Sequence, residues 1–210
     1  MCSRYELKIS LKDLPWQLKL NMPKGFKDNY EEQALIKPSD PVIVVKQEEQ
    51  KISTSFMLWG LIAEWSKDPI NSPKPFNARG ETLDTKAFFS TSWKHRRCLL
   101  PASGFFEQGY RIRTKDCKHF WLAGLWNKWL GADGSEIESC AIITTHPNAL
   151  LRPIHNRMPV IIPNGLEAKW LNQADKIGLL ELKKLLGEWH PKGWVAEPLQ
   201  PKIQKKQLMV

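Results

Sequence analysis

The chain has 210 residues, 42% of them hydrophobic, and its 31 lysine and arginine residues exceed 22 acidic residues to give a formal net charge of +9. This length suits one large domain or two small ones with a substantial core. No apolar run approaches the roughly 20 residues of a membrane helix, which excludes a helical membrane protein. The positive charge favours a polyanionic partner such as nucleic acid, although a charge that only keeps the protein in solution is the alternative.

The first half of the chain predicts short strands separated by irregular segments. Residues 6–35 mix charged and apolar side chains and contain part of a short helix. A β-branched run at 41–45 and a second run at 53–58 indicate two strands joined by a polar turn. A loop with three prolines covers 66–76, and a helix is expected over about 83–90.

The second half predicts longer strands and amphipathic helices. Strands are expected over 120–126, 139–145, 160–162 and 194–196, and helices over 147–151, 166–171 and 174–186. Many short strands with few inserted helices indicate an α+β fold, mostly β with peripheral helices, and not an alternating βαβ chain. Because no repeat or linker divides the chain, a single domain over 1–210 is expected, with a short basic tail from about residue 202.

Cysteine usage indicates a reducing compartment. The four cysteines form no CxxC pair, and the N-terminal residues do not resemble a signal peptide. Free thiols in the cytoplasm are therefore expected, with association to the nucleoid if the organism is bacterial. The cysteines are Cys2, Cys98, Cys117 and Cys140.

Cys2 has a position that allows unusual chemistry. Initiator methionine is normally removed ahead of a small residue, which would leave Cys2 with a free α-amine and a thiol on adjacent carbons. An α-amine titrates near ~7.7–8.0, so a useful fraction is nucleophilic at neutral pH. The amine can form an imine with an aldehyde, and the nearby thiol can then close a thiazolidine ring. The alternative is that cysteine stands second in the chain by chance.

Three further pieces of sequence carry residues that packing alone does not require. Asn77 could hydrogen-bond a polar ligand while Arg79 holds a phosphate, or both could serve the start of the next helix. Glu107 follows two aromatic residues, where it is either a solvent-facing strand residue or a general acid–base. His155 lies in a proline-bracketed loop, as a structural residue or as a proton shuttle.

Other chemistries lack the residues they need. The five histidines and four cysteines show no metal-ligand spacing, and there is neither a glycine-rich phosphate loop nor a GxSxG motif. No metal and no other cofactor is therefore expected. Ten tryptophans is a high number for this length. Most are expected to pack in the core or at its rim, but a few, such as Trp59, Trp65 and Trp93, could stack on nucleobases.

Taken together, five motifs resemble those of the SRAP family (SOS response-associated peptidase), whose members process abasic sites in DNA. The motifs keep the family's order and spacing over nearly the whole chain. They are Met1–Tyr5, Trp59–Trp65, Asn77–Thr82, Arg97–Glu107 and Ile154–Pro159.

This resemblance implies a mostly β SRAP-type fold, with a barrel-like core of short strands and a basic groove for single-stranded DNA. It implies that Cys2 forms a thiazolidine crosslink with the aldehyde of an abasic site, that Asn77 orients the reacting groups, and that Glu107 and His155 move protons. DNA contacts are expected from Arg4 and Arg79 on phosphates and from Trp59 and Trp65 on bases. A monomer is expected.

Two other functions remain open. Cys2 could be the nucleophile of a peptidase that removes its own Met1, with His155 as base and Glu107 as orienting group; a lyase activity on DNA is a related possibility. A plain single-stranded DNA binder is the third reading.

The sequence departs from the family pattern at three places. Ser3 replaces the usual Gly, Gln108 replaces the Trp that follows the Glu, and the Tyr-Asn-x-Ala-Pro segment is not recognisable over 30–41. These departures concern how DNA is wedged or stacked more than whether it is crosslinked.

Overall fold

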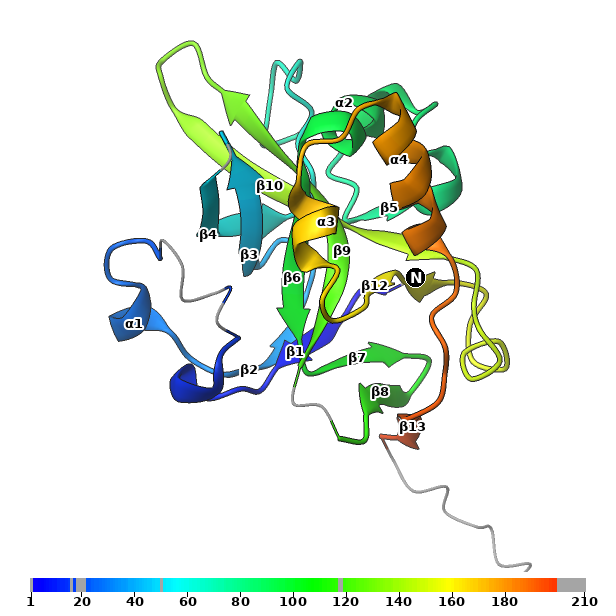
Figure 1. Cartoon of the computed structure of the whole chain (residues 1–210). Coiled ribbons are helices and arrows are strands. Elements are labelled where there is room, and N and C mark those ends of the chain that lie inside the picture. The colour runs from blue at the N-terminus through cyan, green and yellow to red at the C-terminus, as the bar shows by residue number, and fades with distance from the viewer. Residues whose placement is uncertain (1, 16, 18–21, 50, 117–118, 200–210) are drawn as a thin grey trace, which may run out of the picture.

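The computed structural model describes residues 2–15, 17, 22–49, 51–116 and 119–199. Its core is a five-stranded barrel (Figure 1), built from β3 (Pro41–Glu48), β4 (Lys51–Trp59), β6 (Arg97–Ala102), β9 (Phe120–Leu130) and β10 (Glu136–Thr145). The barrel closes in the order β3, β4, β10, β9, β6, and the β4–β10 pair is parallel while the other four pairs are antiparallel. The predicted mostly β fold with a barrel-like core is confirmed.

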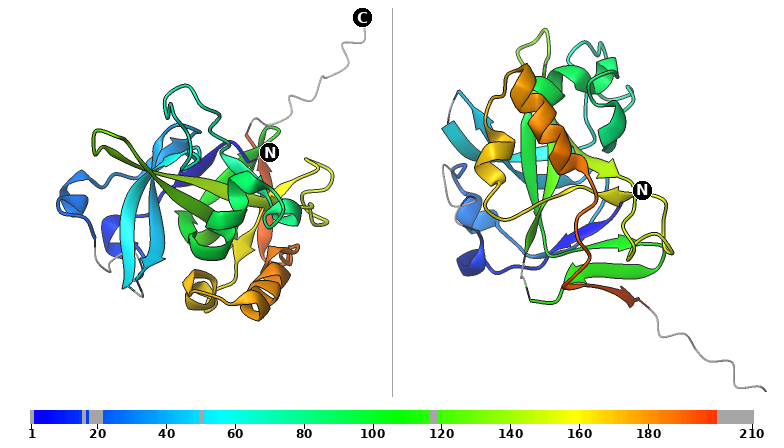
Figure 2. Two further views of the ribbon diagram at one scale, coloured as in Figure 1. Left: turned by 90° about the horizontal axis from the view of Figure 1, so that it is seen from above. Right: turned by 45° about the vertical axis from the view of Figure 1, so that its right-hand side comes forward.

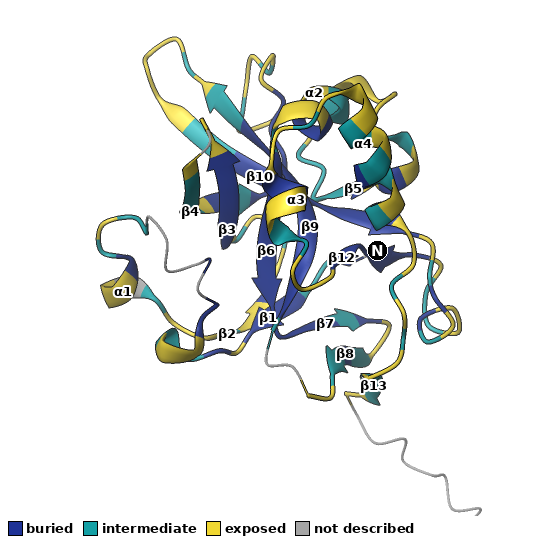
Figure 3. Cartoon of the chain, in the orientation of Figure 1, coloured by how far each residue is buried: buried dark blue, intermediate teal, exposed yellow. Residues whose placement is uncertain are grey.

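Burial on both faces explains why the barrel strands are so apolar. Every residue of β6 is buried, and so are the first eight residues of β9. One face of these two strands fills the barrel and the other is covered, so alternation between polar and apolar side chains is weak, whereas β4 keeps exposed residues between its buried ones. Figure 3 shows these strands as the buried centre of the molecule, with exposed residues on the helices and loops around it.

A second antiparallel sheet lies beside the barrel. Its order is β13 (Trp194–Pro198), β8 (Tyr110–Thr114), β7 (Gly104–Glu107), β1 (Tyr5–Leu7) and β2 (Gln33–Ile36). Sequence analysis predicted β13 of this sheet but no strand at β1, β2, β7 or β8, because strands of three to five residues carry too few positions to show a period of two. Pairing with β7 on one side and with β2 on the other makes β1 a strand.

The remaining elements are short and peripheral. The α-helices α2, α3 and α4 gather on one side of the barrel, while α1 lies at the other (Figures 1 and 2). The helices are α1 (Phe26–Asn29), α2 (Ala87–His95), α3 (Glu167–Leu171) and α4 (Lys176–Lys183), the 3₁₀ turns cover Leu11–Asp13, Gly80–Thr82 and Lys184–Leu186, and the other strands are β5 (Asn77–Arg79), β11 (Met158–Pro159) and β12 (Ile161–Ile162).

Two predicted helices differ from the structure. The helix expected over 83–90 begins only at Ala87, because the chain first forms the 3₁₀ turn Gly80–Thr82 and the backbone of Lys86 is extended, at φ −80° and ψ 114°. The segment 147–151 is not a helix but a turn, in which the Asn148 carbonyl accepts from Leu151 and Arg152. The other helices and the strands expected after residue 40 occur close to their predicted positions.

Arg97 joins two helices to the barrel. Its side chain is 2% exposed and donates to the carbonyls of Trp93 (2.7 Å) and Lys94 (3.0 Å) in the last turn of α2. It also donates to the carbonyls of Trp170 (2.9 Å) and Asn172 at the end of α3. Helix carboxyl ends carry unpaired carbonyls and partial negative charge, so one cation satisfies both.

The expected basic tail from residue 202 lies outside the described residues. Within the described ranges, no helix has both the length and the apolar character that crossing a bilayer requires.

Candidate active site

The candidate site lies where the second sheet meets the end of β10. Strand β5 pairs with one edge of this end of β10 and β11 with the other, and β7 pairs with β1. These pairings bring together Cys2, which precedes β1, Asn77 in β5, Glu107 at the end of β7, and His155 in the loop before β11. The four predicted catalytic residues thus come from four separate segments.

Asn77 contacts Cys2 directly. Its Nδ2 donates to the Cys2 carbonyl oxygen at 2.8 Å, and its Oδ1 is buried with no hydrogen-bond partner among the described residues. Ala78 is fully buried, so the period of two along β5 points Asn77 and Arg79 away from the core. Asn77 therefore holds the backbone of Cys2 with one end and offers an acceptor with the other.

Glu107 and His155 face one another. Glu107 and Phe105 lie on the buried face of β7, and Glu107 Oε1 is 3.9 Å from His155 Nε2. This distance exceeds a hydrogen bond but is short enough for a proton to pass through one small bridging group. The side chains are 9% and 18% exposed, respectively.

Cys2 is fully buried in the structure. Burial, together with the negative charge of Glu107, raises the pKa of the thiol to about 12. The sulfur is therefore a neutral thiol at physiological pH, and its reaction requires a group that accepts its proton.

Gln108 lies at the rim beside Glu107. It is exposed, and it forms the β7–β8 turn with Gly109, at φ values of 46° and 81°. Two successive left-handed residues are typical of the tight hairpin turn that matches strand twist. Gln108 thus presents a flexible amide where the family pattern has an indole.

The residues expected to contact DNA differ in accessibility. Arg79 is exposed and Arg4 is half-buried. Trp65 is 61% exposed and packs its edge on Phe88, with ring centroids 5.8 Å apart. The expectation for Trp59 is wrong: its indole is 0% exposed, and Nε1 donates to the Phe76 carbonyl at 2.8 Å, so no ring face is available to a base.

Sequence analysis overlooked two charged residues next to the site, Glu81 and Arg157. Arg157 Nη1 lies 2.6 Å from Glu81 Oε1, and Nη2 lies 2.9 Å from Oε2. Burial alone would raise the pKa of Glu81, but the hydrogen bonds from Arg157 hold it below its ordinary value. Glu81 stands inside the motif Asn77–Thr82 and Arg157 inside Ile154–Pro159, and membership of these motifs is the sequence feature that could have identified them.

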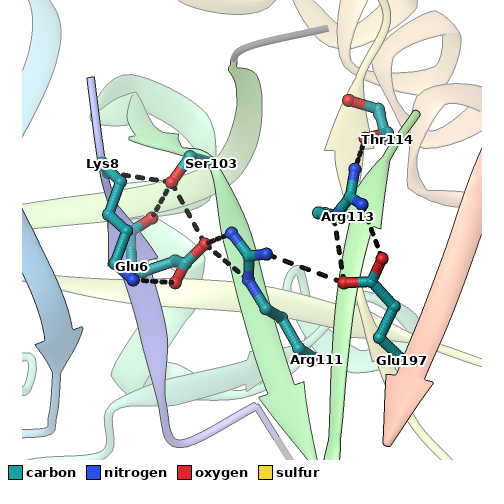
Figure 4. A network of polar contacts seen from close by, with 7 residues as sticks. All are labelled: Glu6, Lys8, Ser103, Arg111, Arg113, Thr114 and Glu197. Carbon is teal, nitrogen blue, oxygen red and sulfur yellow. Dashed lines mark hydrogen bonds and ion pairs between the residues drawn. The ribbon is translucent and has the colours of Figure 1, made fainter. Parts of the chain in front are cut away.

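A polar network anchors the strand that leads to Cys2 (Figure 4). Glu6 in β1 is 1% exposed, and its Oε1 accepts from Arg111 Nε at 2.9 Å and from Arg111 Nη2. Ser103 Oγ and the Lys8 ammonium complete its surroundings. Gly104 lies opposite Glu6 because a Cβ there would lie 2.7 Å from Glu6 Oε1.

The far side of this network ties the last strand to the sheet. Glu197 in β13 accepts hydrogen bonds from Arg113 at 2.5 and 3.1 Å, and its carboxylate lies 3.7 Å from the Arg111 guanidinium. A ladder of alternating charge therefore crosses the outer face of the sheet from β1 to β13, and it fixes the strand from which Cys2 extends.

No group of three or more histidine, cysteine, aspartate or glutamate side chains in the described part of the chain could hold a metal ion.

Comparison with known proteins identifies the family. The model of the SOS response associated peptidase (SRAP) family matches residues 1–206. The chain belongs to the SRAP family. This SRAP protein is 34% identical over 183 residues to the abasic site processing protein YoqW of Bacillus subtilis. The aligned region covers 82% of this chain and 80% of the relative.

Further relatives agree with this assignment. The abasic site processing protein YoaM of Bacillus subtilis is 33% identical over 183 residues, covering 82% of this chain and 79% of the relative. A solved structure of a protein from Bacteroides thetaiotaomicron superposes with a TM-score of 0.79 at 24% identity, covering 93% of this chain and 90% of that one. The latter likeness shows that the fold is shared.

Proposed function

We propose that this SRAP protein processes abasic sites in single-stranded DNA by forming a covalent thiazolidine crosslink through Cys2 after Met1 is removed. The observation that carries the proposal is the hydrogen bond from Asn77 to the Cys2 carbonyl at 2.8 Å, with Glu107 and His155 at the same place. The relatives named abasic site processing proteins support the choice of substrate.

The proposed reaction has two bond-forming steps. The α-amine of Cys2 adds to the aldehyde carbon of the ring-opened sugar, and loss of one water gives an imine. The Cys2 sulfur then adds to the imine carbon while its proton passes to the nitrogen, which closes the ring. The product therefore equals protein plus abasic DNA minus one water.

Each site residue has a role in these steps. The free Oδ1 of Asn77 is suited to accept a hydrogen bond from the α-amine and so to orient its lone pair. Glu107 and His155 are suited to exchange protons with the sugar oxygen, the departing water and the thiol. Because Cys2 is fully buried, the proposal requires its surroundings to open on loss of Met1 or on DNA binding.

Positive charge around the site suits DNA. Arg79 is exposed on the strand that carries Asn77, and the backbone of Arg4 pairs with β7 beside Glu107. We assign both guanidinium groups to phosphates and Trp65 to a base, since base stacking on an exposed indole contributes about 1–3 kcal/mol.

The raised pKa of Cys2 favours this reaction over a peptidase. A cysteine peptidase that removes its own Met1 depends on a thiolate nucleophile, whereas burial in the chain that still carries Met1 raises the pKa of this thiol to about 12 and keeps it protonated. Imine formation needs only the amine in its first step, so a neutral thiol is no obstacle. Self-removal of Met1 by the same residues is the second candidate function.

Incubation of the protein with an abasic oligonucleotide, followed by a denaturing gel and intact mass, tests the proposal. We expect a stable adduct of the stated mass, its absence in Cys2→Ala, and its retention in Cys98→Ala, which removes an internal buried thiol. Cys2→Ser keeps the amine and should give an imine that only a hydride reagent traps. An unchanged adduct in Cys2→Ala would refute the assignment.

The peptidase reading has its own measurement. Intact mass of the wild type and of Glu107→Ala shows whether Met1 is removed from each. Equal removal from both proteins would contradict self-processing. Binding to single-stranded DNA that ignores an abasic site and weakens smoothly with salt would instead indicate a plain binder.

A further inference from the structure

The ion pair between Glu81 and Arg157 lies next to His155 but has no part in the chemistry proposed above. Arg157 is 8% exposed. Its two terminal nitrogens bind the two oxygens of Glu81, and Nη2 also donates to the Thr144 carbonyl at 2.6 Å and to Thr144 Oγ1 at 3.2 Å. Such a two-point pair fixes orientation as well as position.

The backbone of Arg157 contacts the catalytic histidine. Its N–H donates to His155 Nδ1 at 2.9 Å, and a nitrogen that accepts a hydrogen bond cannot carry a proton in the neutral ring. The ring proton is then on Nε2, the nitrogen that faces Glu107 at 3.9 Å.

The opposite tautomer also has a partner nearby. The Arg157 carbonyl oxygen lies 3.3 Å from His155 Nδ1, so a small shift of the Arg157 backbone would let Nδ1–H donate to it. Which tautomer exists therefore depends on how firmly Arg157 is held, and its side chain is held by Glu81 from the 3₁₀ turn and by Thr144 from β10.

We propose that Glu81 and Arg157 are positioning residues that keep His155 in the Nε2-protonated tautomer, directed at Glu107. This inference rests on the proposed function, because the tautomer matters for the proton transfers of crosslinking. An Nε2–H can give its proton to a sugar or water oxygen held between the two side chains. A lone pair on Nε2 would instead repel the carboxylate of Glu107.

The terminal nitrogens of Arg157 are held by protein groups, while its buried Nε has no hydrogen-bond partner among the described residues. Its side chain is nearly buried, and both terminal nitrogens already bind protein oxygens. Glu81 is 36% exposed, and its Oε1 also lies 3.2 Å from His146 Nε2. Arg152 on the same loop is a natural control, since its side chain is 69% exposed and only approaches Glu188 at 4.0 Å.

The first experiment measures the tautomer without DNA. Protein with ¹⁵N-labelled histidine is observed by NMR at pH 8.5, where an ordinary imidazole is neutral, and His155 is assigned from His155→Gln. We expect a protonated Nε2 and an unprotonated Nδ1 in the wild type and in Arg152→Gln. Glu81→Gln and Arg157→Lys should show a mixture of both tautomers.

The second experiment measures crosslinking at saturating abasic DNA. Glu81→Gln and Arg157→Lys should lower the maximal rate roughly 10- to 100-fold, part of the roughly 100- to 10,000-fold that general acid–base catalysis supplies. The DNA concentration at half-maximal rate should not change. Thermal unfolding confirms that each variant is folded at the assay temperature.

Three outcomes overturn the proposal. The first is a wild-type His155 protonated on Nδ1, and the second is an unaltered tautomer and rate in both variants. The third is a raised half-maximal DNA concentration with an unchanged maximal rate, which would make Arg157 a phosphate contact. The wild-type protein could instead form no adduct while the tautomer of His155 still depends on Glu81 and Arg157. That result would contradict the proposed function and leave the positioning role of the ion pair intact.

Discussion

Substitution of Gly104 by alanine tests how β1 is held in place. An added Cβ would lie 2.7 Å from Glu6 Oε1, 3.2 Å from Cδ and 3.3 Å from Cγ. Glu6 cannot turn aside freely, because its carboxylate is buried against Arg111 and Ser103. Overpacking costs about 1–3 kcal/mol, and a weakened hydrogen bond to a charged group adds about 1.5–3 kcal/mol when it is lost.

We therefore expect Gly104→Ala to lower the free energy of unfolding by about 2–4 kcal/mol. The same substitution in a Glu6→Ala protein should cost less than about 0.5 kcal/mol, or stabilise, since the clash is gone and alanine restricts the unfolded chain. Urea unfolding followed by tryptophan fluorescence provides all four free energies of this double-mutant cycle.

Gly187→Ala is the matched control. Its nearest atom to an added Cβ is 3.6 Å away and its φ is −72°, so the free energy of unfolding should change by less than about 1 kcal/mol. If Gly104→Ala cost the same with and without the Glu6 carboxylate, this account of the glycine would be refuted. We also expect slower crosslinking by Gly104→Ala, because β1 leads directly to Cys2.

Three other predictions concern DNA, the helices and pH. Trp65→Ala should weaken single-stranded DNA binding by about 1–3 kcal/mol in fluorescence anisotropy without changing the urea midpoint; unchanged affinity would remove Trp65 from the interface. Arg97→Lys should lower the free energy of unfolding by about 2–4 kcal/mol, because one ammonium cannot satisfy four carbonyls, and a loss below about 0.5 kcal/mol would contradict that role. Burial raises the pKa of the thiols of Cys2, Cys98 and Cys140, in the case of Cys2 from 9.0 to about 12. Above pH ~9 the folded protein keeps protons that the unfolded chain releases, so the free energy of unfolding should fall as pH rises further, by about 1.4 kcal/mol per pH unit for each thiol. Urea midpoints that stay level between pH 8 and 10 would contradict this.

Local patterns predicted four of the five barrel strands and missed β6. The β-branched run at 41–45 and the apolar segments at 120–126 and 139–145 are strands because their side chains are apolar over several successive positions. The second sheet was harder, because β1 has only three residues and one of them, Glu6, is a buried charge. Its strand identity comes from pairing with β7 and from Arg111, which lies 105 residues away in the chain.

The tryptophans show the same division at the level of single residues. Trp59 and Trp65 stand six positions apart in one motif, yet the first is buried and the second is exposed. Trp59 ends β4, where the barrel interior and Tyr5 enclose it, whereas Trp65 lies in the loop that follows. Residue type and spacing do not distinguish the two, since burial depends on which segments pack on each side.

The sequence by itself determined the fold class, the main strands and the four candidate catalytic residues, because these depend on side-chain type and on periods of two and 3.6 residues. Only the tertiary structure decided that Cys2 is buried against Asn77, that Glu107 faces His155, and that Glu81 holds Arg157 beside them. Those three arrangements depend on contacts between residues that are 75, 48 and 76 positions apart in the chain, respectively, and no local pattern records such contacts.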